Sequence, residues 1–192
     1  MKKDIILAGV GGQGILSIAA IIGYAAMEAG LNLKQAEVHG MSQRGGDVQS
    51  HLRISDKEIF SDLIPQGGAD LIISVEPMEA LRYVPYLNAD GWMITNTTTF
   101  INIPNYPAID ALMQDVNAVA HKVAVNADEI AKEVGSPRSM NMVILGAASS
   151  YLDIPYNMLE DGIKFQFGRK GEAIVQANLK AMQAGRDAAK AI

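Results

Sequence analysis

The sequence predicts a three-layer α/β/α fold with a mostly parallel sheet, an inserted β-hairpin and a helical C-terminal part. Short apolar runs, as expected of buried strands, alternate with helical stretches along most of the chain. A glycine-rich turn joins the first run to the first helical stretch, and only helical patterns follow residue 141. A length of 192 residues predicts one domain that spans residues 1–192.

The N-terminal part predicts a strand, a turn, a helix and a second strand. Residues 4–9 form a continuous apolar run, which is typical of a strand covered on both faces. Residues 14–29 are apolar nearly all round and predict a buried helix that stops at Gly30. Residues 33–40 then predict the second strand. Together these elements form a βαβ unit, which makes the fold Rossmann-like.

Two strand-like stretches then interrupt the alternation. They are residues 48–55 (VQSHLRIS) and 58–64 (EIFSDLI), and turn-forming residues lie between them at 55–57 (SDK). This pattern predicts a β-hairpin inserted into the α/β domain. His51 and Arg53 share the face opposite the apolar residues of the first stretch, so we expect both at the surface or at an interface.

The alternation resumes after the hairpin. Strands are expected at residues 69–77, 91–99 and 122–127, and helices at 78–87, 110–120 and 127–135. Residues 100–109, which include Pro104 and Pro107, are expected to be a loop. The last helix, from residue 171, is alanine-rich with a weak apolar stripe and is a candidate for packing on a neighbouring subunit.

Composition excludes several classes of function. Without cysteine, the chain cannot hold an iron–sulfur cluster through thiolates, form a disulfide or use a cysteine nucleophile. Its histidines, His39, His51 and His121, have no zinc-like spacing, so we expect no metal site. The net charge of −5 argues against nucleic-acid binding, and no apolar run is long enough for a bilayer. We expect a soluble, cytoplasmic protein.

The first candidate site is the glycine turn at residues 9–14 (GVGGQG). It fits G-x-G-x-x-G between a strand and a helix, where glycines permit close approach and the helix N-terminus offers free N–H groups to a phosphate. Glu37 lies inside the second strand rather than at its end, which weakens a nicotinamide interpretation. Packing alone is the alternative role of these glycines. The candidate residues are Gly9, Gly11, Gly12, Gln13 and Gly14.

The second candidate site is the polar segment at residues 39–53 (HGMSQRGGDVQSHLR). It follows the carboxyl end of a strand beside the first glycine turn, where open α/β sheets bind ligands. Arg44 is suited to a bidentate bond with a phosphate or carboxylate. A solvated loop is the alternative. The candidate residues are Ser42, Gln43, Arg44, Gly45 and Gly46.

Other polar residues also follow predicted strands or open a helix. Glu76 is expected either to line the site or to cap the next helix. Asn96, Thr97 and Thr98 end a strand and are further candidates for the same edge. Asn141 is expected to be a helix N-cap. Because no G-x-S-x-G elbow, P-loop or close carboxylate pair is present, we assign no catalytic residue.

Several motifs together resemble one family over nearly the whole chain. They are GVGGQGI, EVHGMSQRGG followed by VQSHLRIS, ADLIISVEPMEALR and NMVILGA, and the HGMSQRGG element is the most specific. This combination is similar to the gamma-type subunit, or domain III, of 2-oxoacid:ferredoxin oxidoreductases, and most of all to the indolepyruvate branch.

The resemblance implies a heteromeric enzyme. The family decarboxylates a 2-oxoacid oxidatively, indolepyruvate or another aryl pyruvate in this branch, forms the acyl-CoA from coenzyme A and reduces ferredoxin. Thiamine diphosphate and the iron–sulfur clusters are then expected in a large partner subunit, and ferredoxin is met through the complex. This chain would be an accessory subunit, inactive alone, whose glycine turns face the partner near the active site.

Two other readings stay open. The chain could be a self-contained nucleotide- or flavin-binding oxidoreductase of Rossmann type that uses the first glycine turn. It could also be a pure interaction module, in which the glycines serve packing only. The substrate is open as well, because pyruvate and 2-oxoglutarate branches share this type of subunit.

Overall fold

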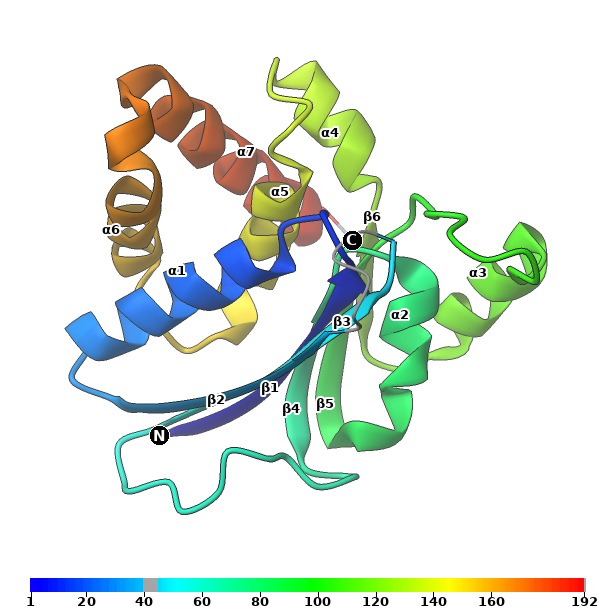
Figure 1. Ribbon diagram of the computed structural model, residues 1–192, viewed down its shortest axis with the longest axis horizontal. Coiled ribbons are helices and arrows are strands. Elements are labelled where there is room, and N and C mark those ends of the chain that lie inside the picture. Colours follow the sequence, from blue (N-terminus) through cyan, green and yellow to red (C-terminus); the bar gives the residue numbers. More distant parts are fainter. Residues whose placement is uncertain (40–44, 192) are drawn as a thin grey trace.

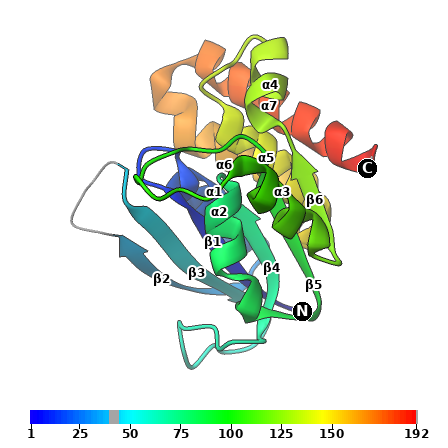
Figure 2. The same ribbon diagram turned by 90° about the vertical axis from the view of Figure 1, so that its right-hand side faces the viewer.

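The computed structural model describes residues 1–39 and 45–191, which form a six-stranded sheet in the order β2-β3-β1-β4-β5-β6. Figure 2 shows β2 and β6 at its two edges. β1 pairs in parallel with β4, β4 with β5 and β5 with β6, whereas β3 runs antiparallel to both β1 and β2. The strands are β1 (Lys2–Val10), β2 (Asn32–His39), β3 (Asp47–Ser55), β4 (Ala69–Ser74), β5 (Leu87–Asn96) and β6 (Lys122–Val125).

Helices cover both faces of the sheet (Figure 1). Alternate residues of β1 point to opposite faces, so Ile5 and Leu7 join one core and Ile6 and Ala8 the other. The first core includes α1, α4, α5, α6 and α7, and the second includes α2 and α3. The helices are α1 (Ile15–Glu28), α2 (Pro77–Arg82), α3 (Ile109–Ala118), α4 (Ala127–Glu133), α5 (Met140–Ala148), α6 (Tyr156–Phe167) and α7 (Glu172–Lys190). The predicted three-layer α/β fold is confirmed.

The predicted position of the β-hairpin is wrong. β3 pairs with β2 on one side and with β1 on the other, so neither edge of β3 is left for residues 58–64. That stretch is not a strand. Side chains of β3 bind its backbone instead: Arg53 Nη1 donates to the carbonyls of Ser61 and Leu63 at 3.0 and 3.1 Å. The insertion of β3 also separates β1 from β2, although the two still run in the same direction.

His51 and Arg53 are not free surface groups, contrary to expectation. His51 is 8% exposed, and its Nδ1 accepts a hydrogen bond from the backbone N–H of Ile64 at 2.9 Å. Arg53 forms a two-point ion pair with buried Asp4, at 2.8 Å from Nε and 3.0 Å from Nη2. Both side chains therefore attach the segment after β3 to the sheet.

The environment of His51 predicts a dependence of stability on pH. Burial lowers the pKa of His51 below its ordinary value of 6.5, and the nearby Arg53 lowers it further, whereas Asp62 raises it. The unfolded chain then binds the proton more readily than the folded chain. Neutral His51 therefore contributes stability that is fully present above about pH 6.5 and is lost as the pH falls through the folded pKa. We expect the melting temperature to fall between pH 7.5 and 5.5, and to fall less in His51→Gln. Parallel curves for the two proteins would contradict the assignment.

The last helix packs on α5 within the chain, and its packing on a neighbouring subunit stays a prediction. α7 crosses α5 at two glycines, Gly146 and Gly185, where the backbones come into contact. A Cβ atom built on Gly146 would lie 1.8 Å from the carbonyl oxygen of Met182, and one built on Gly185 would lie 1.9 Å from that of Val143. The small residues of this helix therefore serve a close helix–helix crossing.

Candidate functional site

The two glycine segments lie side by side at the carboxyl end of β1. The N–H of Gly11 donates to the carbonyl of Gly46 at 2.8 Å, and the N–H of Gly45 donates to the carbonyl of Gly11 at 3.3 Å. We call residues 11–14 together with residues 45–46 the glycine edge. Ser42, Gln43 and Arg44 fall outside the residues that the structure describes, although they directly precede this edge in the chain.

Glycine is required at two positions of the first turn. Gly12 and Gly14 have φ values of 99° and 81°, in the left-handed region that side chains disfavour. Gly14 is also the N-cap of α1 and supplies no side-chain hydrogen bond to the N–H groups of the first turn. The N–H of Ser17 already donates to the carbonyl of Gly14 at 3.1 Å, so the N–H groups at the very start of α1 are the ones left for an anion or a partner's backbone.

Gly9 and Gln13 have structural roles. A Cβ atom on Gly9 would lie 2.4 Å from Cγ2 of Val75, so this glycine permits close packing of β1 on the segment after β4. The side-chain Oε1 of Gln13 accepts a hydrogen bond from the N–H of Val10 at 2.8 Å and closes the turn. The packing explanation thus holds for Gly9. Ligand contact stays a prediction for the other candidate residues of the first turn, Gly11, Gly12, Gln13 and Gly14.

Asn102, which the sequence did not single out, contacts the glycine edge. Its Nδ2 donates to the carbonyl of Gly45 at 2.8 Å, and its buried Oδ1 has no hydrogen-bond partner among residues 1–39 and 45–191. Glu76 holds this loop in place, because its fully buried carboxylate accepts bonds from the N–H of Phe100 at 3.3 Å and from the Tyr106 hydroxyl. Burial and this hydroxyl bond raise the pKa of Tyr106. Loop residue Asn102 is thereby fixed beside the edge.

The structure resolves the other expectations for this edge. Glu76 is the N-cap of α2, with the N–H of Glu79 donating to Oε2 at 2.8 Å, so it caps rather than lines an open site. Asn96 is held by structural bonds to Asp128 and to the N–H of Ala127. The N-cap of α5 is Ser139 and not Asn141. Asn141 Nδ2 instead donates to the carbonyl of Gly14 at 3.1 Å.

Apolar side chains are exposed near the glycine edge. Phe100 and Ile101, which precede Asn102 on its loop, are 44% and 66% exposed. Val38, near the carboxyl end of β2, is 56% exposed. Exposed apolar groups beside a polar backbone surface are typical of protein–protein contacts.

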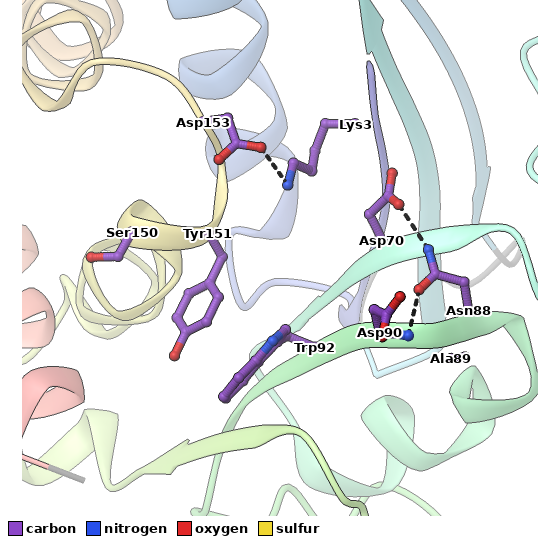
Figure 3. A pocket seen from close by; sticks show the side chains of 9 residues that line it. All are labelled: Lys3, Asp70, Asn88, Ala89, Asp90, Trp92, Ser150, Tyr151 and Asp153. Atoms are coloured by element: carbon purple, nitrogen blue, oxygen red, sulfur yellow. Dashed lines mark hydrogen bonds and ion pairs between the residues drawn. The ribbon is translucent and has the colours of Figure 1, made fainter. Parts of the chain in front are cut away.

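A polar pocket of about 590 Å³ lies at the opposite end of the sheet, near the amino ends of β1, β4 and β5 (Figure 3). Most of its charged groups have partners within the chain. Lys3 Nζ lies 2.6 Å from Asp153, and Asn88 Nδ2 donates to Asp70 at 2.8 Å (Figure 3). Since most of its polar groups are already partnered, this pocket is the weaker candidate.

The described residues contain neither a cluster of metal-ligating side chains nor a membrane-spanning helix. Within residues 1–39 and 45–191, no group of three or more metal-ligating side chains could hold an ion. In the same ranges, no helix is long and apolar enough to cross a membrane. Because the whole sequence lacks cysteine, its residues do not fit an iron–sulfur cluster.

Comparison with known proteins decides the family. The model of the pyruvate ferredoxin/flavodoxin oxidoreductase family matches residues 4–188. The chain belongs to this family. Indolepyruvate oxidoreductase subunit IorB of Archaeoglobus fulgidus is 42% identical, over 96% of this chain and 94% of the relative. The relatives are subunits of oxidoreductases, which supports the accessory-subunit reading over the self-contained nucleotide-binding one.

Solved structures agree with this family membership. The gamma subunit of a keto/oxoacid ferredoxin oxidoreductase from Geobacter sulfurreducens PCA has a TM-score of 0.71 at 25% identity, with 99% of each chain covered. A 2-oxoglutarate:ferredoxin oxidoreductase from Magnetococcus marinus, with 2-oxoglutarate, coenzyme A and succinyl-CoA bound, has a TM-score of 0.77 at 24% identity. The superposition covers 100% of this chain and 31% of the Magnetococcus marinus chain. At this identity the likeness shows the fold alone.

Proposed function

We propose that the chain is the accessory subunit of a heteromeric, cytoplasmic 2-oxoacid:ferredoxin oxidoreductase. The complex decarboxylates indolepyruvate or another aryl pyruvate oxidatively to the acyl-CoA and reduces ferredoxin. The observation that carries this proposal is the glycine edge: two glycine turns bind each other through their backbones beside exposed apolar side chains, and the described residues of the edge include no catalytic group. The identity of 42% with an indolepyruvate oxidoreductase subunit supports the choice of substrate.

The chemistry then belongs to a large partner subunit. That partner holds thiamine diphosphate and the iron–sulfur clusters, and ferredoxin docks on the complex. Nucleic acid and membranes play no part. The glycine edge faces the partner near its active site, where Phe100 and Ile101 enter the interface and the turn lies close to coenzyme A or the oxoacid.

Arg44 is proposed to bind an anionic group of coenzyme A or of the oxoacid at this edge. A guanidinium bound in bidentate fashion to a phosphate or carboxylate contributes about 1.5–3 kcal/mol. We therefore expect Arg44→Ala in the assembled enzyme to raise the KM for one of these substrates roughly 10- to 100-fold. Steady-state kinetics with each substrate varied in turn measures the effect.

Two variants serve as controls for Arg44→Ala. Arg44→Lys keeps the charge but loses the planar fork, so an intermediate KM is expected. Arg169→Ala removes an exposed arginine from the turn before α7 and should leave both KM values unchanged. Unchanged KM values for coenzyme A and oxoacid in an assembled Arg44→Ala enzyme would favour the pure interaction module.

A further inference from the structure

A second cavity, of about 600 Å³, lies among the helices on the α1 side of the sheet. The segment between α4 and α5, the start of α5 and the first half of α7 form its walls, and Ser17 of α1 contributes as well. Figure 1 shows these elements above the sheet, where α4, α5 and α7 come together. The cavity adjoins the glycine edge through Asn141, which lines the cavity and also donates to the carbonyl of Gly14.

The charge of the cavity is entirely positive. Among the described residues, its charged lining residues are Arg138 and Lys170, and no carboxylate lines it. Neither cation forms an ion pair with another described residue; Lys170 lies over the ring of Phe167, 5.3 Å from its centroid. Two cations that face one cavity without a counter-charge favour an anionic occupant.

Three buried polar side chains lie in the same wall with hydrogen-bonding capacity left over. Ser136, Ser139 and Asn178 are only 7%, 5% and 6% exposed, and all three line the cavity. Ser139 is the N-cap of α5 but makes no side-chain capping bond, and the Ser136 hydroxyl has no partner among the described residues. Asn178 Nδ2 donates to the carbonyl of Ile174 at 2.8 Å, which leaves Oδ1 without a partner there.

These oxygen atoms are not among the fully buried atoms without a partner, so they remain accessible from the cavity and are open to a ligand or water. The N-terminal turn of α5, a nine-residue helix, adds the positive end of a helix dipole at Ser139. The hydroxyls, the two cations and this helix end together suit a dianionic group with several acceptor oxygens.

Most of the remaining lining is apolar. Phe167, Ile174 and alanine side chains of α7 form this part of the wall. We infer that the cavity binds a phosphate monoester with an apolar or aromatic body: the phosphate at Arg138, Lys170 and the two serine hydroxyls, and the body against Phe167 and Ile174. This site is independent of the proposed function, so either can fail without the other.

Isothermal titration of the full-length chain tests the assignment, with phenyl phosphate, inorganic phosphate, phenol and benzoate as probes. We expect phenyl phosphate to bind, inorganic phosphate to bind roughly tenfold more weakly because it lacks the apolar body, and phenol not to bind. Arg138→Gln and Lys170→Gln should each weaken phenyl phosphate binding about tenfold or more. Arg169→Gln, next to Lys170 but outside the cavity lining, should bind normally.

Three outcomes would overturn the inference. They are absence of phenyl phosphate binding to the wild-type chain, binding that both Gln variants retain in full, and benzoate binding more tightly than phenyl phosphate. A melting temperature close to that of the wild type in each variant shows that any lost affinity comes from the site. Should a variant unfold, Ser139→Ala takes its place with the same expected weakening.

Discussion

Gly185→Ala is expected to lower the free energy of unfolding by about 3 kcal/mol or more. The new Cβ atom would lie 1.9 Å from the carbonyl oxygen of Val143 and 2.7 Å from its carbon. These are backbone atoms of α5, which cannot rotate away as the end of a side chain can. α7 would have to separate from α5, and the apolar contacts on both sides of the crossing would weaken.

Denaturant unfolding of the wild type and variants measures this effect. Gly146→Ala should be similarly damaging, because its Cβ atom would meet the Met182 carbonyl oxygen at 1.8 Å. Gly168→Ala is the matched control: Gly168 has a helical φ of −54° and nothing within 4 Å of its added Cβ. We expect this control to be neutral or stabilising by up to about 1 kcal/mol. A loss below about 0.5 kcal/mol in Gly185→Ala would refute the close crossing.

The second large effect is expected at the ion pair between β1 and β3. Asp4 is 1% exposed, and both of its carboxylate oxygens bind Arg53, at 2.8 and 3.0 Å. Asp4→Ala leaves the guanidinium without its counter-charge in a mostly buried position, which typically costs about 3 kcal/mol. Because Arg53 also binds the Ser61 and Leu63 carbonyls, the segment after β3 should loosen as well.

A double variant separates the unpaired charge from the loss of packing. Asp4→Leu combined with Arg53→Met replaces the pair by apolar groups and should recover much of the loss. Asp161→Ala, which removes the exposed pair with Lys164, should change stability by less than about 1 kcal/mol. If Asp4→Ala is as mild as Asp161→Ala in denaturant unfolding, the pair does not hold β1 to β3. Hydrogen exchange of residues 58–64 reports the loosening directly.

Local patterns in the sequence predicted the parts of the fold that depend on local chemistry. The strand, glycine turn and helix at residues 2–28 were predicted because burial pattern and turn residues lie next to each other in the chain. The hairpin was misplaced because an apolar run does not reveal which strand edge remains free. β3 pairs with β1, whose residues lie more than 35 positions earlier, and this leaves residues 58–64 unpaired.

The candidate site was predicted only in part, for the same reason. The meeting of the two glycine segments could be expected from strand order, but the contacts that fix them could not. Asn102 and Gly45 are 57 residues apart, and Asn141 and Gly14 are 127 apart. Likewise, the alternation in β3 placed His51 opposite the apolar face without indicating that the loop ending at Ile64 covers it.

Affinity purification of the chain from its native cell extract, under anaerobic conditions, tests the central claim most directly. The proposed function predicts a brown eluate that contains a large second subunit, iron and thiamine diphosphate, and that reduces a dye in the presence of indolepyruvate and coenzyme A. A colourless chain that elutes alone and binds a nicotinamide or flavin nucleotide would contradict the claim.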